Sequence, residues 1–214
     1  MARPKAADYE QHRARIVGLA VQAFARIGYP SASMASLAEA CGTSKAALYH
    51  YFPSKDALLF EALDGYTRRL LAIVAAQQAR GLAPREELAE IVRALMGEYR
   101  SSHAYHAALL NDVKFLAEHE RRRIRAQGRA VVDAVAATLA RAWPQRFAGA
   151  ERTVVTMALL GMINFTFAWL RPDGPVSYAQ FAELVIDLWS KGLDGPTMTP
   201  LEGRTDDQAV RLEG

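Results

Sequence analysis

A tight turn between two short helical segments, followed by a proline, constrains the fold of this chain most strongly. The pattern S-M-A-S-L-A-E-A-C-G-T-S-K-A-A-L-Y-H-Y-F-P-S-K-D spans residues 33–56. Ser33 can cap the first helix, Gly42 permits the turn, and Pro53 ends the second helix, because the residue before a proline avoids helical geometry. Two short helices about such a turn form a helix-turn-helix, whose second helix can lie in the major groove of DNA.

Most of the remaining sequence has the apolar spacing of helices, and few stretches favour strands. Helices are expected over residues 9–28, 34–41, 44–51, 55–79, 85–101, 103–117, 120–143, 151–170 and 178–192. The pattern predicts an all-α fold with a three-helix N-terminal head and a longer helical C-terminal body. We expect the head at 1–55, the body at 56–194 and a flexible tail at 195–214. The boundary falls inside the fourth helix, so no flexible linker separates head and body.

The excess positive charge of the chain lies in the head. Residues 1–60 carry seven Lys or Arg and four Asp or Glu, and this surplus equals the net charge of the whole chain, +3. A basic local field favours phosphate contacts, although ordinary scatter of surface charge would explain it equally well without the motif. The single cysteine, Cys41, excludes an intrachain disulfide and suits a reducing compartment. The polar N-terminus has no signal-peptide core, so we expect a cytoplasmic protein.

The side chains that packing would leave outward on the second short helix suit contacts with DNA. They are Thr43, Ser44, Lys45, Ala46, Tyr49, His50 and Tyr51, and Lys55 follows at the start of the next helix. Hydroxyls and free N–H groups at a helix start bind phosphate, and a small side chain such as Ala46 allows close approach to bases. On an isolated short helix, an exposed polar face without function would be the better interpretation. The preceding helix, the glycine turn and the following Phe-Pro-Ser-Lys together favour DNA binding.

Residues 9–60 resemble the DNA-binding head of the TetR family of bacterial repressors. The matching elements are the helix from Ile16 to Gly28, S-M-x-x-L-A-x-x-C-G at 33–42, and S-K-A-A-L-Y-H-Y-F-P-S-K-D-A-L-L at 44–59. The resemblance implies an all-helical homodimer whose body binds a ligand and forms the dimer. It also implies a recognition helix at about 44–50. By the same resemblance, the DNA contacts would be Ser44, Lys45, Tyr49, His50 and Lys55.

The last two helices of the body match the dimer-forming helices of that family. The resemblance implies that segments 151–170 and 178–192 form a four-helix bundle with a second copy, which would read a near-palindromic operator. Eighteen uncharged residues, 153–170, also reach the length of a membrane-spanning helix. They include Thr156 and Asn164, and a helix packed on two sides would be equally apolar. We therefore interpret this segment as a helix of the dimer interface and not as a membrane-spanning helix.

The resemblance further implies a ligand cavity in the body. Candidate lining residues are Met96, Tyr99, His103, Asn111, Phe115, Asn164, Phe167 and Trp169. Aromatic residues at such positions are more often core than cavity wall. Asn164 stands in an apolar helix, where an amide needs a hydrogen-bond partner from a ligand, from the protein or in the dimer seam. The sequence leaves these alternatives open.

Two stretches indicate what the ligand could be. Residues 109–125 and 161–174 resemble a TetR subgroup linked to fatty-acid, phenylacetate and sterol catabolism, in which several regulators respond to acyl-CoA thioesters. Arg122 and Arg125, with their neighbours Arg121 and Arg123, would then meet the CoA phosphates, since arginine matches phosphate geometry. A solvated charged helix face is the simpler interpretation of any one of these arginines. A planar or cationic hydrophobic compound, as sensed by multidrug efflux regulators of the family, is the alternative effector.

Enzyme chemistry finds little support in the sequence. His103 and His106 share a helical face, and His119 is not far along the chain, but neither cysteine nor a dense acidic partner accompanies them as metal ligands. No G-x-S-x-G, phosphate-binding loop or dinucleotide fingerprint is present. We therefore expect no enzyme, metal or resident cofactor. We expect a repressor that a hydrophobic or acyl-CoA effector releases from DNA. A DNA-binding architectural or partner-controlled protein without a ligand site remains an alternative.

Overall fold

The computed structural model describes residues 3–144, 151–171 and 173–195, and within them the chain is helical with no strand. The elements are α1 (Arg3–Ile27), α2 (Met34–Ala40), α3 (Lys45–Tyr51), α4 (Lys55–Gln78), α5 (Pro84–Ser101), α6 (His103–Asn111), η1 (Val113–Phe115), α7 (Glu118–Ala142), α8 (Glu151–Asn164), η2 (Phe165–Ala168) and α9 (Tyr178–Asp194). The predicted all-α fold is confirmed. All but the first residue of the tail expected at 195–214 lies outside the described residues.

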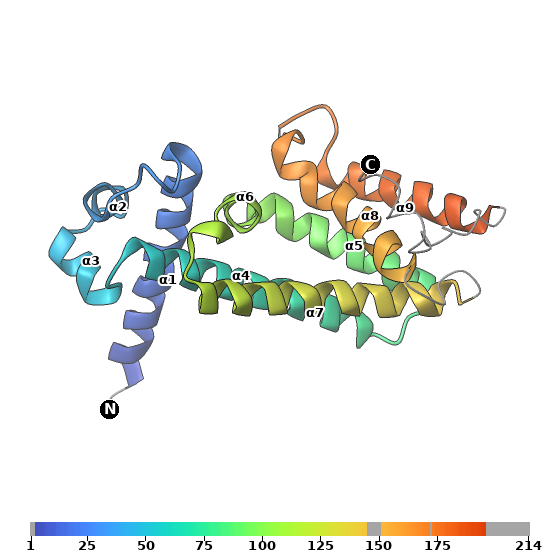
Figure 1. Cartoon of the computed structure of the whole chain (residues 1–214), viewed down its shortest axis with the longest axis horizontal. Coiled ribbons are helices and arrows are strands. Elements are labelled where there is room, and N and C mark those ends of the chain that lie inside the picture. The colour runs from blue at the N-terminus through green and yellow to red at the C-terminus, as the bar shows by residue number, and fades with distance from the viewer. Residues whose placement is uncertain (1–2, 145–150, 172, 196–214) are drawn as a thin grey trace, which may run out of the picture.

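Short polar caps and one glycine shape the head, which forms one end of the molecule in Figure 1. Ser33 caps α2 in a reciprocal pair with Ser36, and Ser44 caps α3 by accepting from the backbone N–H of Ala47 at 3.1 Å. Gly42 has φ +64° between these helices, a conformation that side chains with a Cβ rarely adopt. The predicted turn and helix starts are therefore confirmed.

The long helices α4 and α7 run side by side along the molecule, and α5, α8 and α9 complete the body (Figure 1). The apolar residues on the inner face of α4 are buried: Leu58, Leu59, Ala62, Leu63, Tyr66, Leu70 and Val74. The apolar core of the head ends at Leu63 of this helix, and the core of the body begins at Tyr66. The head core also takes in Ala108 of α6, Leu116 and Ile124 of α7, so these elements contribute to it along with α4. The division at residues 55 and 56 stays a prediction.

A buried carboxylate ties α4 to α7 where the two cores meet. Asp64 is 5% exposed, and it accepts from Arg123 Nε at 2.7 Å and from Gln127 Nε2 at 2.9 Å. Arg68, one turn later on α4, adds an ion pair at 3.1 Å. A buried carboxylate is stabilised only while donors surround it, so this cluster fixes the two long helices against each other.

The sequence prediction is wrong at the ends of two helices. The helix expected over 103–117 ends at Asn111 and gives way to η1, and the helix expected over 151–170 ends at Asn164 and tightens into η2. At the second break Thr166 Oγ1 donates back to the carbonyl of Ile163 at 2.7 Å. Side-chain bonds of this kind compete with regular helix geometry. In the described ranges, no helix is both long and apolar enough to cross a bilayer.

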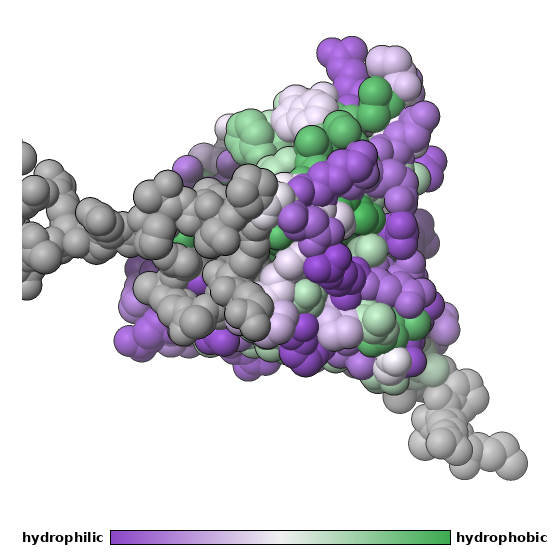
Figure 2. Space-filling view, turned by 90° about the vertical axis from the view of Figure 1, so that its right-hand side faces the viewer, coloured by the Kyte–Doolittle hydropathy of each residue, from purple (hydrophilic) through white to green (hydrophobic). Residues whose placement is uncertain are grey.

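An apolar surface remains uncovered on α8, η2 and α9. Its residues are Val154, Met157, Met162, Phe165, Trp169, Leu184 and Leu188, each at least 37% exposed. Figure 2 turns the body end toward the viewer, and hydrophobic residues gather in its upper part, at the height of α8 and α9 in Figure 1. Exposed apolar side chains that gather in this way are typical of interaction surfaces.

The turn at Gly42 gives a test of the head. We expect Gly42→Ala to destabilise the protein by about 1–2 kcal/mol, because alanine must adopt a positive φ there. Gly97→Ala in α5 is the matched control, since a Cβ there meets no atom within 4 Å and alanine favours a helix. Urea unfolding measures both free energies, and equal effects of the two variants would contradict this account of the turn.

Candidate DNA interface and effector cavity

The outward face of α3 carries most of the predicted DNA contacts. Ser44, Lys45, Ala46, Tyr49 and His50 are exposed, while Leu48 of the same helix is fully buried. The Lys45 ammonium lies 5.9 Å from the centre of the Tyr49 ring. The apolar side of α3 packs in the head core. Its polar side therefore faces solvent and carries hydrogen-bond donors along its length. Such a face suits hydrogen bonds to phosphates and base edges.

The end of α3 rests on α1. Tyr51 is half-buried, and its ring stacks on Tyr9 at 4.9 Å and lies 5.6 Å from His12. Thr43, before the helix, is also half-buried. Tyr9 and His12 were missed from the sequence, although an aromatic residue and a histidine one turn apart on the outer face of the first helix were a usable signal. Whether Tyr51 and Thr43 touch DNA stays a prediction.

Lys55 has an internal role that the sequence did not reveal. Its Nζ donates to three backbone carbonyls of the α1–α2 loop, those of Tyr29 at 3.1 Å, Pro30 at 3.3 Å and Ala32 at 3.0 Å. The ammonium also lies 4.6 Å from the centre of the Tyr29 ring, which strengthens the brace. With its three donors engaged, Lys55 is poorly placed for the phosphate contact expected of it, which remains untested.

A cavity of about 250 Å³ lies in the body between α4, α5, α6, α7 and α8. Its lining residues are Thr67, Leu70, Tyr99, His106, Leu109, Leu110, Val113, Ile124, Arg125, Gly128, Val131, Val132, Leu160 and Asn164. Three of the predicted ligand residues, Tyr99, Arg125 and Asn164, are among them. The α7 stripe at Gly128, Val131 and Val132 was missed, because the sequence does not show that two apolar stripes of α7 face different neighbours.

The other seven predicted ligand residues are not part of this wall. They are Met96, His103, Asn111, Phe115, Arg122, Phe167 and Trp169. Met96 lies in the body core and is 1% exposed. Phe115 stacks on Tyr29 of the head at 5.0 Å, and Trp169 is half exposed and meets Phe181 edge to face. As effector contacts they remain predictions, and the geometry of the cavity does not bring them together.

Neutral hydrogen bonds organise one side of the cavity. His106 lies 3.1 Å from the Tyr66 hydroxyl through Nδ1 and 2.9 Å from the carbonyl of Asn164 through Nε2. Because a carbonyl only accepts, Nε2 carries the proton and Nδ1 accepts from Tyr66. Tyr99 donates to Asn164 Oδ1 at 2.7 Å and stacks on His106 at 3.9 Å. Burial lowers the pKa of His106 to about 4, so the imidazole is neutral near pH 7.

The charged residues near the cavity are arginines. No acidic residue lines it, and Arg125 on α7 is its one charged lining residue among the described positions. Arg121 is engaged by Glu118 and Arg123 by Asp64. Arg122, Arg125 and Arg129 are exposed along one side of α7 and make no hydrogen bond or ion pair within the described part of the chain. An anionic group at this edge would therefore meet unoccupied guanidinium donors.

The predicted weak metal set does not assemble. His103 Nε2 lies 3.1 Å from the carbonyl of Phe167, and His106 is bound as described above. The described residues contain no group of three or more His, Cys, Asp or Glu side chains with the spacing of a metal site.

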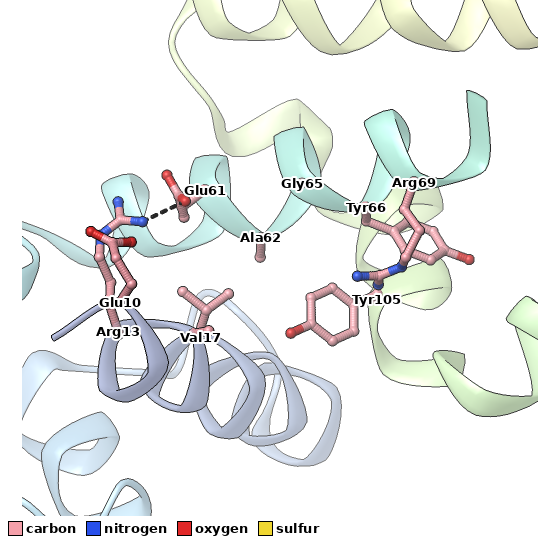
Figure 3. Close-up of a pocket in the computed structure, with 10 residues that line it drawn as sticks. Glu10, Arg13, Val17, Glu61, Ala62, Gly65, Tyr66, Arg69 and Tyr105 are labelled. Carbon is pink, nitrogen blue, oxygen red and sulfur yellow. Dashed lines mark hydrogen bonds and ion pairs between the residues drawn. The ribbon is translucent and has the colours of Figure 1, made fainter. Parts of the chain in front are cut away.

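A second cleft, of about 220 Å³, separates α1 of the head from α4 and α6 (Figure 3). Arg13 on α1 bridges it to Glu61 on α4 with an ion pair at 2.6 Å. At the other end, Arg69 lies 5.4 Å from the rings of both Tyr66 and Tyr105 and donates to Glu98 at 2.7 Å. Arg13 thus joins α1 of the head to α4, whereas Arg69 joins α4 to α5 and α6 within the body.

Two family models match the chain. The model described as "Bacterial regulatory proteins, tetR family" covers residues 16–62, and the model described as "Tetracyclin repressor-like, C-terminal domain" covers residues 81–193, more than half of the chain. The boundary between the two models falls inside α4 and the loop after it. Both halves of the fold are therefore matched independently.

Individual relatives agree with the family models. The repressor KstR2 of Rhodococcus jostii is 29% identical over 109 residues, 51% of this chain and 53% of that protein. The chain spans between about a quarter and about half the length of the curated relatives it matches. A TetR-family regulator structure from Bordetella parapertussis is 33% identical with a TM-score of 0.79, covering 86% of this chain and 95% of that one. AibR in complex with isovaleryl coenzyme A and operator DNA shares the fold, with 24% identity, a TM-score of 0.74 and coverage of 83% and 97%.

The buried histidine gives a test of the neutral network. The unfolded chain binds a proton at His106 below about pH 6.5, whereas the folded chain does so only near pH 4. Stability from this residue is therefore complete above pH 6.5 and is lost as the pH falls toward 4, by about 3 kcal/mol. We expect His106→Gln to flatten this part of the stability curve in urea unfolding at graded pH, and His119→Gln, at an exposed position, to leave it unchanged. Parallel curves for wild type and His106→Gln would contradict the assignment.

Proposed function

The chain belongs to the TetR family of DNA-binding transcriptional regulators, and we propose that it is a ligand-responsive repressor that binds a near-palindromic operator as a homodimer. The observation that carries the proposal is the exposed polar face of α3, on a helix whose apolar side is buried in the head. We propose the cytoplasm as its location, since a bacterial regulator acts where the DNA is.

The exposed residues of α3 fall into two groups, one suited to phosphates and one suited to base edges. Lys45, Tyr49 and the capped start of α3 at Ser44 suit phosphates, and Ala46 leaves room for base edges or thymine methyl groups. His50, exposed beside Tyr9, suits the flank of the groove. Phosphate contacts set affinity and its dependence on salt, while contacts to base edges set sequence preference.

The uncovered apolar surface of α8, η2 and α9 supports the homodimer. Pairing this surface with a second copy about a two-fold axis would bury Met157, Leu184 and Leu188, each at least half exposed in the single chain. The two recognition helices must then lie one turn of DNA apart, about 34–36 Å, to read two half-sites. Head and body are joined by the continuous helix α4, so a change of body shape alters this spacing.

An acyl-CoA thioester is the effector class that the cavity favours. A volume of about 250 Å³ is below the roughly 300–1,000 Å³ of sites for drug-sized ligands, so it suits a short acyl group with the remainder of the molecule outside. Arg125 lines the cavity, and Arg122 and Arg129, exposed on the same helix, suit the phosphates of coenzyme A that would lie outside it. The fold is shared with AibR, whose structure contains isovaleryl coenzyme A. A cationic drug is disfavoured because the lining contains no carboxylate.

A route from the cavity to the head runs through η1. Leu110 and Val113 form part of the cavity wall, and Phe115, two residues later, stacks on Tyr29 of the head. Tyr29 is in turn bound to Asp56 and braced by Lys55. We propose that an acyl group in the cavity displaces η1 and thereby the heads, which releases the operator.

If α3 contacts DNA, substitutions on its exposed face should weaken DNA binding without changing the number of chains in the assembly. We expect Lys45→Ala to weaken binding to a duplex selected by the wild-type protein, and to reduce the slope of log affinity against log salt by about one. Tyr49→Phe should weaken binding through loss of the hydroxyl. Arg100→Ala, at an exposed position of α5, is the charge-matched control and should bind like wild type. Fluorescence anisotropy measures affinity, and sedimentation should show two chains for every variant. A single-chain mass for Lys45→Ala would refute the assignment of that residue.

The effector assignment predicts that filling the cavity blocks binding. A Cβ at Gly128 would meet no atom within 4 Å, and this glycine lines the cavity, so Gly128→Leu places a side chain where the acyl group would lie. We expect it to bind isovaleryl coenzyme A at least about 10-fold more weakly than wild type, by calorimetry. Gly97→Leu, equally open but on the exposed side of α5, should match wild type. Absence of thermal stabilisation by acyl-CoAs of any chain length and by hydrophobic drugs alike would favour the architectural alternative.

A further inference from the structure

We propose that Asn164 reads a carbonyl oxygen of the effector, and that Tyr99 is the positioning residue that points its amide into the cavity. This inference rests on the effector site proposed above and specifies the functional group that the site selects. It follows from an inventory of the hydrogen-bond donors that line the cavity.

The polar side chains of the lining are nearly all engaged. Thr67 donates to the carbonyl of Leu63 at 2.8 Å, and both nitrogens of His106 are bound. Tyr99 uses its proton on Asn164 Oδ1. The Asn164 Nδ2 group has no hydrogen-bond partner among the described residues, and Arg125 is the other lining residue with unoccupied donors. One neutral donor is therefore available to a ligand in an otherwise apolar space.

The amide is held in one orientation from two directions. Its oxygen accepts from the buried hydroxyl of Tyr99 at 2.7 Å, so the planar NH₂ group is directed away from Tyr99. The backbone of the same residue is fixed because its carbonyl accepts from His106 at 2.9 Å, at the point where α8 ends. Tyr66 in turn fixes the tautomer of His106. Three helices besides α8 thus determine where this single donor lies.

The neighbours of the amide determine what it can select. Leu70, Val131 and Leu160 line the same cavity and offer only apolar surface. An N–H donor in such surroundings favours a molecule that places an acceptor there and penalises one that leaves the donor unpaired. An ammonium group has no acceptor to offer. A carbonyl flanked by a short apolar chain fits both requirements, and the thioester of an acyl-CoA carries one at the junction of chain and carrier.

The first experiment uses two probes of similar shape, of which only one has a carbonyl group. Isovaleryl coenzyme A is compared by calorimetry with the thioether in which a methylene group takes the place of the carbonyl. We expect wild type to bind the thioester at least about 10-fold more tightly. Asn164→Leu should bring the ratio of the two affinities close to one, and Asn164→Asp, which keeps the size but removes the donor, should do the same. Gln11→Leu, at an exposed position of α1 outside the cavity, is the control and should keep the wild-type ratio.

Tyr99→Phe tests positioning separately from packing. It removes the hydroxyl but keeps the ring on His106, so we expect an intermediate ratio with an unchanged preference for chain length. A purely structural role would weaken thioester and thioether equally and leave the ratio at the wild-type value. Equal binding of the two probes by wild type would overturn the inference and leave the acyl-CoA effector intact.

A second pair of probes separates the carbonyl from coenzyme A. Methyl isobutyl ketone is compared with the alkene that replaces its oxygen by a methylene group, by ligand-observed NMR on wild type and Asn164→Leu. A preference for the ketone that Asn164→Leu abolishes supports the inference even if no CoA ester binds, and in that case only the proposed effector class fails. No preference for the ketone in wild type would overturn the inference.

Discussion

The buried carboxylate of Asp64 is the interaction on which the arrangement of head and body depends. It lies between the last head-core residue of α4, Leu63, and the first body-core residue, Tyr66, and it is bound from α7 by Arg123 and Gln127. A carboxylate that is 5% exposed cannot lose these partners without a large desolvation cost, so α4 and α7 must move together at this level. The head packs on α4 and α6 and takes Ile124 of α7 into its core, so any change that separates α4 from α7 must happen elsewhere along their length.

The elements best placed to move when the cavity is filled are α6 and η1, which lie outside the Asp64 cluster. The three-residue η1 follows the break at Asn111 and contributes Val113 to the cavity and Phe115 to the stack on Tyr29. A 3₁₀ turn has poorer hydrogen-bond geometry than an α-helix and is more easily displaced. Tyr29 belongs to the loop before α2, so a displacement at the cavity wall reaches the helix-turn-helix over a few contacts. The Phe115–Tyr29 contact thus joins the 3₁₀ turn at the cavity wall to the loop that Lys55 braces.

The sequence predicts local structure well and side-chain partners poorly, and particular residues show why. Caps and turns depend on neighbours in the chain, so Ser33, Gly42 and Ser44 could be assigned from spacing alone. Lys55 lies at the same kind of helix start, yet its ammonium is used on carbonyls more than twenty residues away, which no local pattern encodes. For this reason the residues that line the cavity were predicted least well. Sequence shows that a residue is apolar or aromatic, but only packing decides whether it faces the core, as Met96 does, the head, as Phe115 does, or the cavity.

The break at Asn164 joins three surfaces that would otherwise be independent. Its side chain lines the cavity, its carbonyl accepts from His106 of α6, and the η2 turn that follows holds Phe167, whose carbonyl lies against His103. The same turn exposes Phe165 and Trp169 on the apolar surface proposed for the second copy. If α8 had continued as a regular helix to residue 170, these side chains would have followed its period and His103 and His106 would have met carbonyls already used inside the helix. The irregular end of α8 thus brings together, within residues 164–167, the amide proposed to read the ligand, the two carbonyls that bind the α6 histidines, and Phe165 of the surface proposed for a second copy. In the proposed function, one short segment therefore contacts both the effector cavity and the partner.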